Sequence, residues 1–156
     1  MEWQIEWLVA VGVNKIVLAI SRDDSIIKNF VGMIRQKYKI EVVCSVESEP
    51  LNTGGAIKLA EKHLRTLPDD KSDNSTGEDF FVLNSDVMCD FPFKNMMELH
   101  KSRRAEVSVL VTKVDNPARY GIVVHDADSG KVHRFVEKPQ EYVGDYINAG
   151  LYIFNE

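Results

Sequence analysis

The chain has 156 residues, of which 44% are hydrophobic and 28% are charged, a balance typical of a folded domain rather than of a disordered chain. Nineteen basic and twenty-four acidic side chains give a net charge of −5, which gives no reason to expect a nucleic-acid-binding surface. No apolar run approaches the roughly 20 residues that cross a bilayer, and no signal peptide is evident. Cys44 and Cys89 lack metal-ligand or CxxC spacing, so we expect buried, reduced thiols in a cytoplasmic protein.

The first part of the sequence alternates helical and extended patterns. Apolar residues recur at helical spacing in some stretches, and short apolar runs indicate buried strands in others. Gly12 is a typical helix stop, and Asp24 or Ser25 can cap a helix. The predicted elements are a helix over 2–11, a strand over 15–20, a helix that reaches Tyr38, a strand over 40–46, a helix from Thr53 to Leu67, an exposed loop over 68–79 and a strand over 80–83.

The second part adds a hairpin to this alternation. The predicted elements are a helix over 93–103, a strand over 107–111, a β-hairpin formed by 122–124 and 132–136, and a last strand over 147–154. Strands that alternate with helices form βαβ units with a largely parallel sheet. We therefore expect an α/β, Rossmann-like fold whose mixed, mainly parallel sheet has helices on both faces and an inserted β-hairpin.

Asp86 is the first residue that could carry chemistry. It follows the apolar strand 80–83 through Asn84 and Ser85, and ligands of open α/β sheets bind beyond the carboxyl ends of the strands. A carboxylate there can hold Mg²⁺ that also bridges substrate phosphates. The alternative is a structural turn in which Asp86 caps the next helix.

Lys138 and Glu137 come at the end of the predicted hairpin. Pro139 favours an extended backbone at Lys138, which would fix the direction of the side chain. An ammonium group held in this way is a good phosphate ligand, and Glu137 could accept hydrogen bonds from sugar hydroxyls. The alternative is a solvated charge that protects a sheet edge from aggregation.

Two further segments carry small residues beside a polar group. Residues 49–55 place two glycines at a helix start, where the backbone could approach a flat or anionic ligand. The alternative is a tight turn capped by Thr53. Asn148 lies on an apolar strand beside Ala149 and Gly150, which leaves room for a ligand hydroxyl; the alternative is a buried amide satisfied by backbone.

Each of these motifs is weak alone, whereas their order along the chain is specific. The order is E-P-L-N-T-G-G at 49–55, F-V-L-N-S-D-V at 81–87, Y-G-I-V at 120–123, F-V-E-K-P at 135–139 and I-N-A-G at 147–150. This order resembles the sugar-1-phosphate nucleotidyltransferases and, among them, the mannose-1-phosphate guanylyltransferases of the catalytic β type. The resemblance covers essentially the whole chain and is nearly letter for letter at 86–93 and 132–140.

The resemblance implies an activity and a set of roles. The family transfers GMP from GTP to mannose 1-phosphate, which gives GDP-mannose and pyrophosphate. By resemblance, Asp86 would bind Mg²⁺ and Lys138 would hold the sugar phosphate. Glu137 and Asn148 would contact the sugar, and Gly121 would leave room for it. The other substrate-binding candidates are Asn84 and the residues of a turn along the guanine, Leu51, Asn52, Thr53, Gly54 and Gly55.

The sequence departs from the family pattern in several places. Asn52 stands where the family usually has Gly, and Gly54 stands where Ala is common. The family also has a GxGTRLxP loop before the helix at Glu2 and a second metal-binding Asp beyond Ile153, and the 156 residues contain neither. We therefore expect residues 1–156 to form a partial nucleotidyltransferase domain that makes little or no GDP-mannose by itself.

Two other functions remain open at this point. One is a non-catalytic regulatory or interaction subunit that pairs with a related transferase; a homo-oligomer is also possible. The other is a different nucleotidyltransferase or a metal-dependent glycosyltransferase. The latter usually has an Asp-x-Asp pair, which Asp86 and Asp90 do not form.

Overall fold

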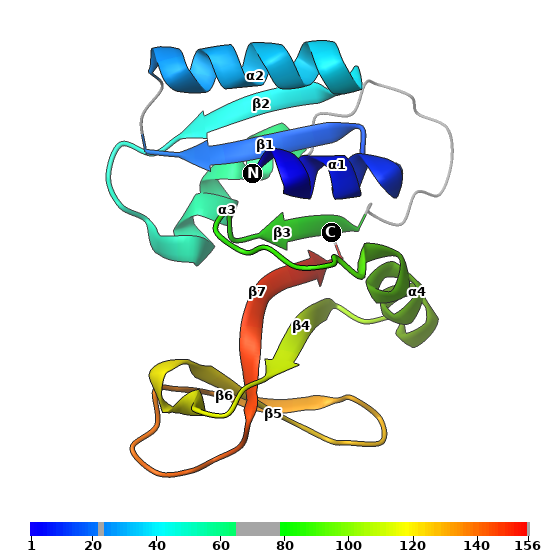
Figure 1. Cartoon of the computed structure of the whole chain (residues 1–156), viewed down its shortest axis with the longest axis vertical. Helices are drawn as coiled ribbons and strands as arrows, with labels where there is room; N and C mark the ends of the chain where they lie inside the picture. The colour runs from blue at the N-terminus through cyan, green and yellow to red at the C-terminus, as the bar shows by residue number, and fades with distance from the viewer. Residues whose placement is uncertain (22–23, 65–78, 156) are drawn as a thin grey trace. The chain divides into compact units, whose positions relative to one another are not determined.

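The computed structural model describes residues 1–21, 24–64 and 79–155. The chain divides into two compact units, Met1–Asn74 and Ser75–Glu156 (Figure 1). Each unit has a sheet of its own, because β1 and β2 pair with each other and the remaining described strands form a second, five-stranded sheet. The predicted loop over 68–79 and Leu67 lie outside the described residues, apart from Asp79.

The first unit is a small α/β layer. Its elements are α1 (Glu2–Ala10), β1 (Lys15–Ile20), α2 (Ser25–Tyr38), β2 (Glu41–Val46) and α3 (Asn52–Leu64). Strands β1 and β2 run parallel. α2 packs on β2, and Ile34 of α2 and Val42 of β2 are both fully buried. The Asp24 carboxylate caps α2 by accepting from the N–H groups of Ile26 and Ile27, which confirms one of the two predicted caps.

The second unit is built around one long strand. Its elements are β3 (Phe80–Leu83), α4 (Phe93–Arg103), β4 (Val107–Lys113), the 3₁₀ helix η1 (Pro117–Arg119), β5 (Gly121–His125), β6 (Val132–Glu137) and β7 (Tyr146–Phe154). β7 pairs antiparallel with β3, β4 and β5, and β6 pairs antiparallel with β5. The core of this unit includes Phe93, Ile122, Leu151 and Ile153, all at most 1% exposed.

A buried histidine joins three elements of the second unit. His100 of α4 is 2% exposed. Its Nδ1 lies 2.8 Å from Ser108 Oγ on β4, and its Nε2 lies 3.4 Å from Asp79 Oδ1, just before β3. The meeting of this serine, histidine and aspartate was not predictable from their spacing along the chain. Because the imidazole is buried, the contact holds α4, β4 and the start of β3 together.

The predicted elements are largely confirmed, and the predicted sheet is corrected. The hairpin is present as β5–β6, and the sheet content is mixed. The prediction of a mainly parallel sheet is wrong for the described strands, since only β1 and β2 pair parallel. β7 lies between β3 and β4 and runs against both, so these two strands do not form the expected parallel pair. Antiparallel pairing needs no crossover helix, and the inserted hairpin lets the chain return along β7.

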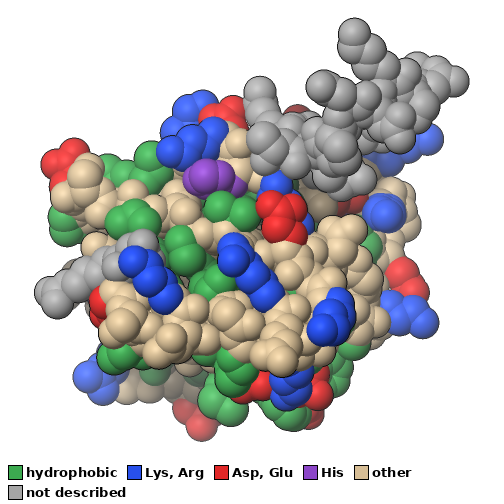
Figure 2. Space-filling view, turned by 90° about the horizontal axis from the view of Figure 1, so that it is seen from above, with side chains coloured by type: hydrophobic (Ala, Val, Ile, Leu, Met, Phe, Trp, Pro, Cys, Tyr) green, Lys and Arg blue, Asp and Glu red, His purple; other side chains and the backbone are tan. Residues whose placement is uncertain are grey.

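Three further observations concern the thiols, the length and polarity of the helices, and the surface charge. The prediction of two buried thiols is wrong, because Cys44 is half-buried and Cys89 is exposed. No helix among the described residues is long and apolar enough to span a membrane. On the face seen in Figure 2, lysine and arginine side chains are separated by hydrophobic and uncharged groups. The positive charges on that face therefore do not merge into one basic patch.

Candidate functional site

Asp86 lies in the turn that follows β3. The Val87 N–H donates to the Asn84 carbonyl oxygen over 3.4 Å, and the side chains of Asn84, Ser85 and Asp86 are all exposed. Helix α4 begins later, and its N-cap residue is Pro92. The alternative interpretation of Asp86 as the cap of the next helix is therefore wrong, and its exposed carboxylate remains accessible to a ligand.

Asn84 and Asn148, which the sequence separates by more than sixty positions, meet at Gly150. The Asn84 N–H donates to the Gly150 carbonyl oxygen over 2.9 Å. The Gly150 N–H donates to Asn148 Oδ1 over 2.9 Å, and Asn148 Nδ2 donates to Tyr152 Oη. We call Asn84, Asn148, Gly150 and Tyr152 the β7 cluster.

The side-chain amide of Asn148 is thus held at both ends. Its oxygen accepts from the Gly150 N–H and its nitrogen donates to Tyr152. The alternative of a buried amide satisfied by backbone therefore holds only for the oxygen, since the side chain is half-buried and its other bond is to a side chain. An amide has two donor hydrogens and two acceptor lone pairs. These two bonds fix the orientation of the amide and leave one N–H and one lone pair that can form hydrogen bonds with hydroxyl groups.

A second group of candidate residues meets where β5 begins and β6 ends. Gly121 and Glu137 are directly paired in the ladder. A Cβ at Gly121 would lie 2.8 Å from Glu137 Oε2, so the missing side chain makes room for that carboxylate. The Lys138 N–H donates to the Tyr120 carbonyl oxygen over 3.2 Å. We call Tyr120, Gly121, Glu137 and Lys138 the hairpin end.

The charged groups of the hairpin end are held loosely. Lys138 Nζ lies 3.6 Å from Glu137 Oε1, and the two side chains are 67% and 73% exposed. Lys138 has φ of 39°, so the extended backbone predicted from Pro139 is wrong. The hydrogen bond to Tyr120 closes the hairpin end at Lys138, and this contact outweighs the local preference. An ammonium and a carboxylate are left adjacent and accessible.

The turn before α3 belongs to the first unit. The Leu51 N–H donates to Glu47 Oε2 over 3.2 Å, and α3 begins at Asn52, so Thr53 lies inside the helix and is not its cap. Asn52 has φ of 55°. This left-handed conformation suits glycine best and asparagine next, which explains physically how Asn52 can replace the family's glycine.

The two glycines of this turn differ in what surrounds them. A Cβ at Gly55 would lie 2.7 Å from Leu51 Cβ, whereas a Cβ at Gly54 would meet nothing within 4 Å. Gly55 is therefore required by the packing of the turn itself. The backbone at Gly54 remains open to approach by another molecule.

The residues around Asp86 suit Mg²⁺ only if other ligands complete the coordination. Among the described residues, no three histidine, cysteine, aspartate or glutamate side chains gather into a metal-binding group. Mg²⁺ prefers oxygen ligands and is often bound by one or two carboxylates together with water and substrate phosphates. The donor set of one exposed carboxylate beside an amide and a hydroxyl fits that mode and not a closed protein cage.

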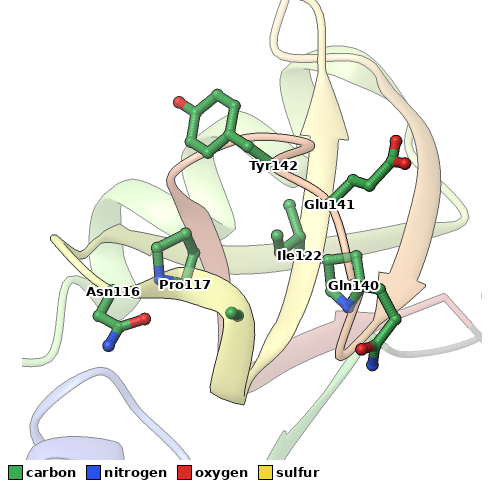
Figure 3. A pocket seen from close by; sticks show the side chains of 8 residues that line it. Asn116, Pro117, Ile122, Gln140, Glu141 and Tyr142 are labelled. Atoms are coloured by element: carbon green, nitrogen blue, oxygen red, sulfur yellow. The ribbon is translucent and has the colours of Figure 1, made fainter.

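A separate hollow of about 210 Å³ lies beside the hairpin end. It is lined by Asn116, Pro117, Ala118, Ile122, Pro139, Gln140, Glu141 and Tyr142. Figure 3 shows Ile122 at its centre, with the polar groups of Gln140 and Glu141 pointing away. Neighbouring side chains of a strand point to opposite faces, so this hollow lies across β5 from Gly121 and contains none of the predicted site residues.

Comparisons with known proteins decide the family. The family model described as nucleotidyl transferase matches residues 1–156. The chain belongs to this nucleotidyl transferase family. It is 48% identical over 152 residues to mannose-1-phosphate guanylyltransferase 1 of Arabidopsis thaliana and 50% identical over 153 residues to mannose-1-phosphate guanyltransferase of Hypocrea jecorina. Each match covers 97% of this chain and 40% of the relative, so the chain spans well under half the length of these relatives.

The fold of this nucleotidyl transferase chain also has a solved counterpart. The crystal structure of a proposed glucose-1-phosphate thymidylyltransferase from Bacillus anthracis superposes with a TM-score of 0.77. The match covers 97% of this chain and 56% of that chain, at 17% sequence identity. At this identity the match establishes the α/β nucleotidyltransferase-like fold and no more.

Gly150 and Tyr152 of the β7 cluster were not predicted as site residues. Gly150 was noted only as a small neighbour of Asn148, and Tyr152 was not singled out. A glycine inside an apolar strand often marks a bulge or a close backbone approach, so Gly150 carried a usable signal. Nothing in the local sequence around Tyr152 indicates that its hydroxyl would reach Asn148.

Proposed function

We propose that this chain carries the sugar-phosphate-binding and metal-binding part of a mannose-1-phosphate guanylyltransferase. The reaction joins GTP and mannose 1-phosphate to give GDP-mannose and pyrophosphate. A phosphate oxygen of the sugar phosphate attacks the α-phosphorus of GTP, a new P–O bond forms, and the bond to pyrophosphate breaks. Such a reaction requires positioning and charge neutralisation rather than a covalent enzyme intermediate.

Lys138 and Glu137 are assigned to mannose 1-phosphate. The exposed ammonium of Lys138 binds the phosphate, which must approach a second, negatively charged phosphate during the reaction. The adjacent Glu137 carboxylate accepts hydrogen bonds from sugar hydroxyls. The single observation that carries this assignment is the arrangement of the hairpin end, where Gly121 makes room for Glu137 and a backbone bond anchors Lys138 beside it.

The β7 cluster and the turn after β3 are assigned to the remaining sugar contacts and to the metal. The fixed N–H and lone pair of Asn148 bind sugar hydroxyls. Asp86, with Asn84 beside it, would hold Mg²⁺. When bound, Mg²⁺ supplies positive charge that neutralises the substrate phosphates.

The turn Leu51–Gly55 is assigned to the guanine of GTP. The open backbone at Gly54 supports this assignment, since a Cβ there would meet nothing within 4 Å. Asn52 holds the left-handed conformation that a glycine usually provides. The relatives from Arabidopsis thaliana and Hypocrea jecorina are named as transferases of a guanylyl group, which supports guanine as the base.

Binding of mannose 1-phosphate to the 156-residue chain tests the proposal. We expect calorimetry to show binding to the unmodified chain and Lys138→Met to weaken it by about 10- to 100-fold, the range for loss of a charge-assisted hydrogen bond. Lys131→Met is the matched control, because Lys131 is an exposed lysine in the turn of the same hairpin. Equal affinity of the Lys138→Met and Lys131→Met variants would contradict the role of Lys138.

An activity assay tests the prediction for the chain by itself. We expect little or no GDP-mannose from GTP, mannose 1-phosphate and Mg²⁺, and Mg²⁺-dependent pyrophosphate release would contradict that expectation.

A pull-down with a full-length guanylyltransferase subunit tests the regulatory alternative. Capture of such a subunit without binding of sugar phosphate or nucleotide by this chain would favour an interaction protein over a substrate-binding one.

A further inference from the structure

Gly150 lies where β7 changes its partners. On one side β7 pairs with β3 through Leu151–Phe154 and with β5 through Ile147. On the other side it pairs with β4 with a shifted register: Val109 faces Tyr152 and Val111 faces Asn148. β4 advances two residues where β7 advances four, so β7 bulges around Gly150. Figure 1 shows β7 as a curved strand.

Both backbone polar groups of Gly150 are used by candidate site residues. Its N–H donates to Asn148 Oδ1 and its carbonyl oxygen accepts from the Asn84 N–H, each over 2.9 Å. One peptide segment thus fixes the side chain assigned to the sugar and the start of the turn that carries Asp86. Tyr152 holds the other end of the Asn148 amide.

The absence of a side chain at Gly150 also leaves space for the side chain of Asn84. A Cβ there would lie 2.5 Å from Asn84 Nδ2, 3.0 Å from Asn84 Cγ and 3.2 Å from Asn84 Cβ. The separation from Nδ2 is shorter than real Cβ contacts, and the separations from Cγ and Cβ are tighter than ordinary van der Waals contact. Rotation of the Asn84 side chain about its Cα–Cβ bond would carry Nδ2 and Cγ away from the added methyl group. The Asn84 Cβ is fixed to the backbone and, at 3.2 Å, would itself have to give by a few tenths of an ångström. Asn84 would have to move, and Ser85 and Asp86 follow it directly.

Backbone strain alone does not explain this glycine, as a comparison with Gly130 makes clear. Both residues have positive φ, 73° at Gly150 and 71° at Gly130. A Cβ at Gly130 would meet nothing within 4 Å. The two sites therefore share the conformational requirement for glycine and differ in the contact with Asn84.

We propose that Gly150 is a positioning residue that sets the Asn84–Asp86 turn and the Asn148 side chain together. It touches neither substrate nor metal itself; it acts through its two hydrogen bonds and through the space that its missing side chain leaves for Asn84. The roles of Asp86 and Asn148 that it serves rest on the proposed function. The positional claim rests on the contacts of Gly150 alone.

Nuclear magnetic resonance of the 156-residue chain tests this inference with Gly150→Ala and the matched control Gly130→Ala. We expect Gly150→Ala to move the backbone amide signals of Ser85 and Asp86 and the side-chain amide signals of Asn148. Titrations with Mn²⁺ and with mannose 1-phosphate should show about tenfold or greater loss of affinity, as expected when a binding group is displaced. Gly130→Ala should leave these signals and both affinities unchanged.

The outcomes separate the inference from the proposed function. If Gly150→Ala folds and its signals at both places match those of Gly130→Ala, the positioning role is wrong. If the unmodified chain binds neither Mn²⁺ nor mannose 1-phosphate, the proposed function is wrong, and the amide signals still decide the positioning role.

A second variant covers the case in which Gly150→Ala does not fold. Asn84→Gly removes the side chain that the added methyl group meets, so the double variant with Gly150→Ala should recover the fold. Failure to recover, with Gly130→Ala folded, would show that the contact with Asn84 is not what requires glycine at this position.

Discussion

The β7 cluster and the hairpin end hold their polar groups in different ways. In the β7 cluster, Asn148 and Asn84 are tied to the backbone of Gly150 by two hydrogen bonds of 2.9 Å. In the hairpin end, the ammonium of Lys138 and the carboxylate of Glu137 are more than two-thirds exposed and lie 3.6 Å apart. The first region fixes its groups before a ligand arrives, whereas the second leaves them able to adjust.

This difference suits the ligands that the two regions are proposed to bind. Directional hydrogen bonds to sugar hydroxyls gain from a fixed amide, because less ordering remains to be done on binding. A phosphate spreads its charge over several oxygens, and the ammonium of a flexible lysine side chain can reach them from more than one direction. Substitutions in the β7 cluster should therefore affect folding and binding together, while substitutions in the hairpin end should affect binding alone.

The largest expected effect is the loss of stability in Gly150→Ala. Alanine at positive φ costs about 1–2 kcal/mol, and overpacking adds about 1–3 kcal/mol, so the free energy of unfolding should fall by about 2–5 kcal/mol. Gly130→Ala should lose only the first part. Urea denaturation of both variants measures the difference. Equal losses in the two variants would show that the contact with Asn84 adds nothing, and that the β7 cluster is not held more rigidly than an open turn.

The next effect is a loss of affinity in Gly121→Ala. The added methyl group would lie 2.8 Å from Glu137 Oε2, but that oxygen ends an exposed side chain and can move away. We expect the free energy of unfolding to change by less than about 0.5 kcal/mol and the affinity for mannose 1-phosphate to fall about tenfold. Gly144→Ala is the control, since its Cβ would make an ordinary 3.5 Å contact with Ile122. A large loss of stability in Gly121→Ala would show that the hairpin end is as rigid as the β7 cluster.

A smaller effect is expected when lysines at positive φ become glycine. Lys138 and Lys39 have φ of 39° and 56°, and relief of this strain is partly offset by the greater freedom of unfolded glycine. Both Lys138→Gly and Lys39→Gly should therefore keep or raise the free energy of unfolding by at most about 1 kcal/mol. Only Lys138→Gly should lose binding of mannose 1-phosphate. Loss of binding in both variants would mean that the assay reports something other than the hairpin end.

The smallest expected effect is a change in the pH dependence of stability when the ion pair between Lys113 and Asp145 is removed. Lys113 Nζ lies 2.9 Å from Asp145 Oδ2, and this hydrogen bond lowers the pKa of Asp145. A folded-state pKa below the unfolded value of about 3.9 stabilises the protein above that pH, and the stabilisation is lost as the pH falls through the folded pKa. Asp145→Asn should therefore show a smaller decrease in urea midpoint between pH 7 and pH 3 than the unmodified chain. Asp115→Asn, at an exposed neighbouring carboxylate, serves as the control, and an equal change in both variants would contradict the role of the pair.

The elements of this fold were predictable because their signals are local. The helix over 93–103 and the strand over 15–20 appear with the predicted bounds, since apolar spacing and caps depend on near neighbours. Strand pairing depends on residues far apart in the chain. The insertion of β7 between β3 and β4 left no mark on the sequence of any of the three strands, and the parallel arrangement expected from alternation was wrong.

The candidate site was predictable to the same extent. Gly121 was predicted from the motif at 120–123 and both Glu137 and Lys138 from the motif at 135–139, and the structure brings the three residues together at one end of the hairpin. The contact between Asn84 and Gly150 was not foreseen, because it depends on how β3 and β7 align. The left-handed conformation of Lys138 was also missed, since a long-range hydrogen bond overrides the preference that Pro139 imposes.

The central place of β7 has a consequence for the order in which the second unit can form. β3, β4 and β5 all need β7 as a partner, and β7 is the last strand of the three pairings to be synthesised. Until the ribosome has released residue 154, these strands expose unpaired edges, and only the local hairpin β5–β6 can close. Among the described strands, β1 and β2 pair only with each other. During translation β1 and β2 can therefore pair before β7 has been made. Of the described strands, β3 and β4 keep unpaired edges for longer, and such edges favour aggregation.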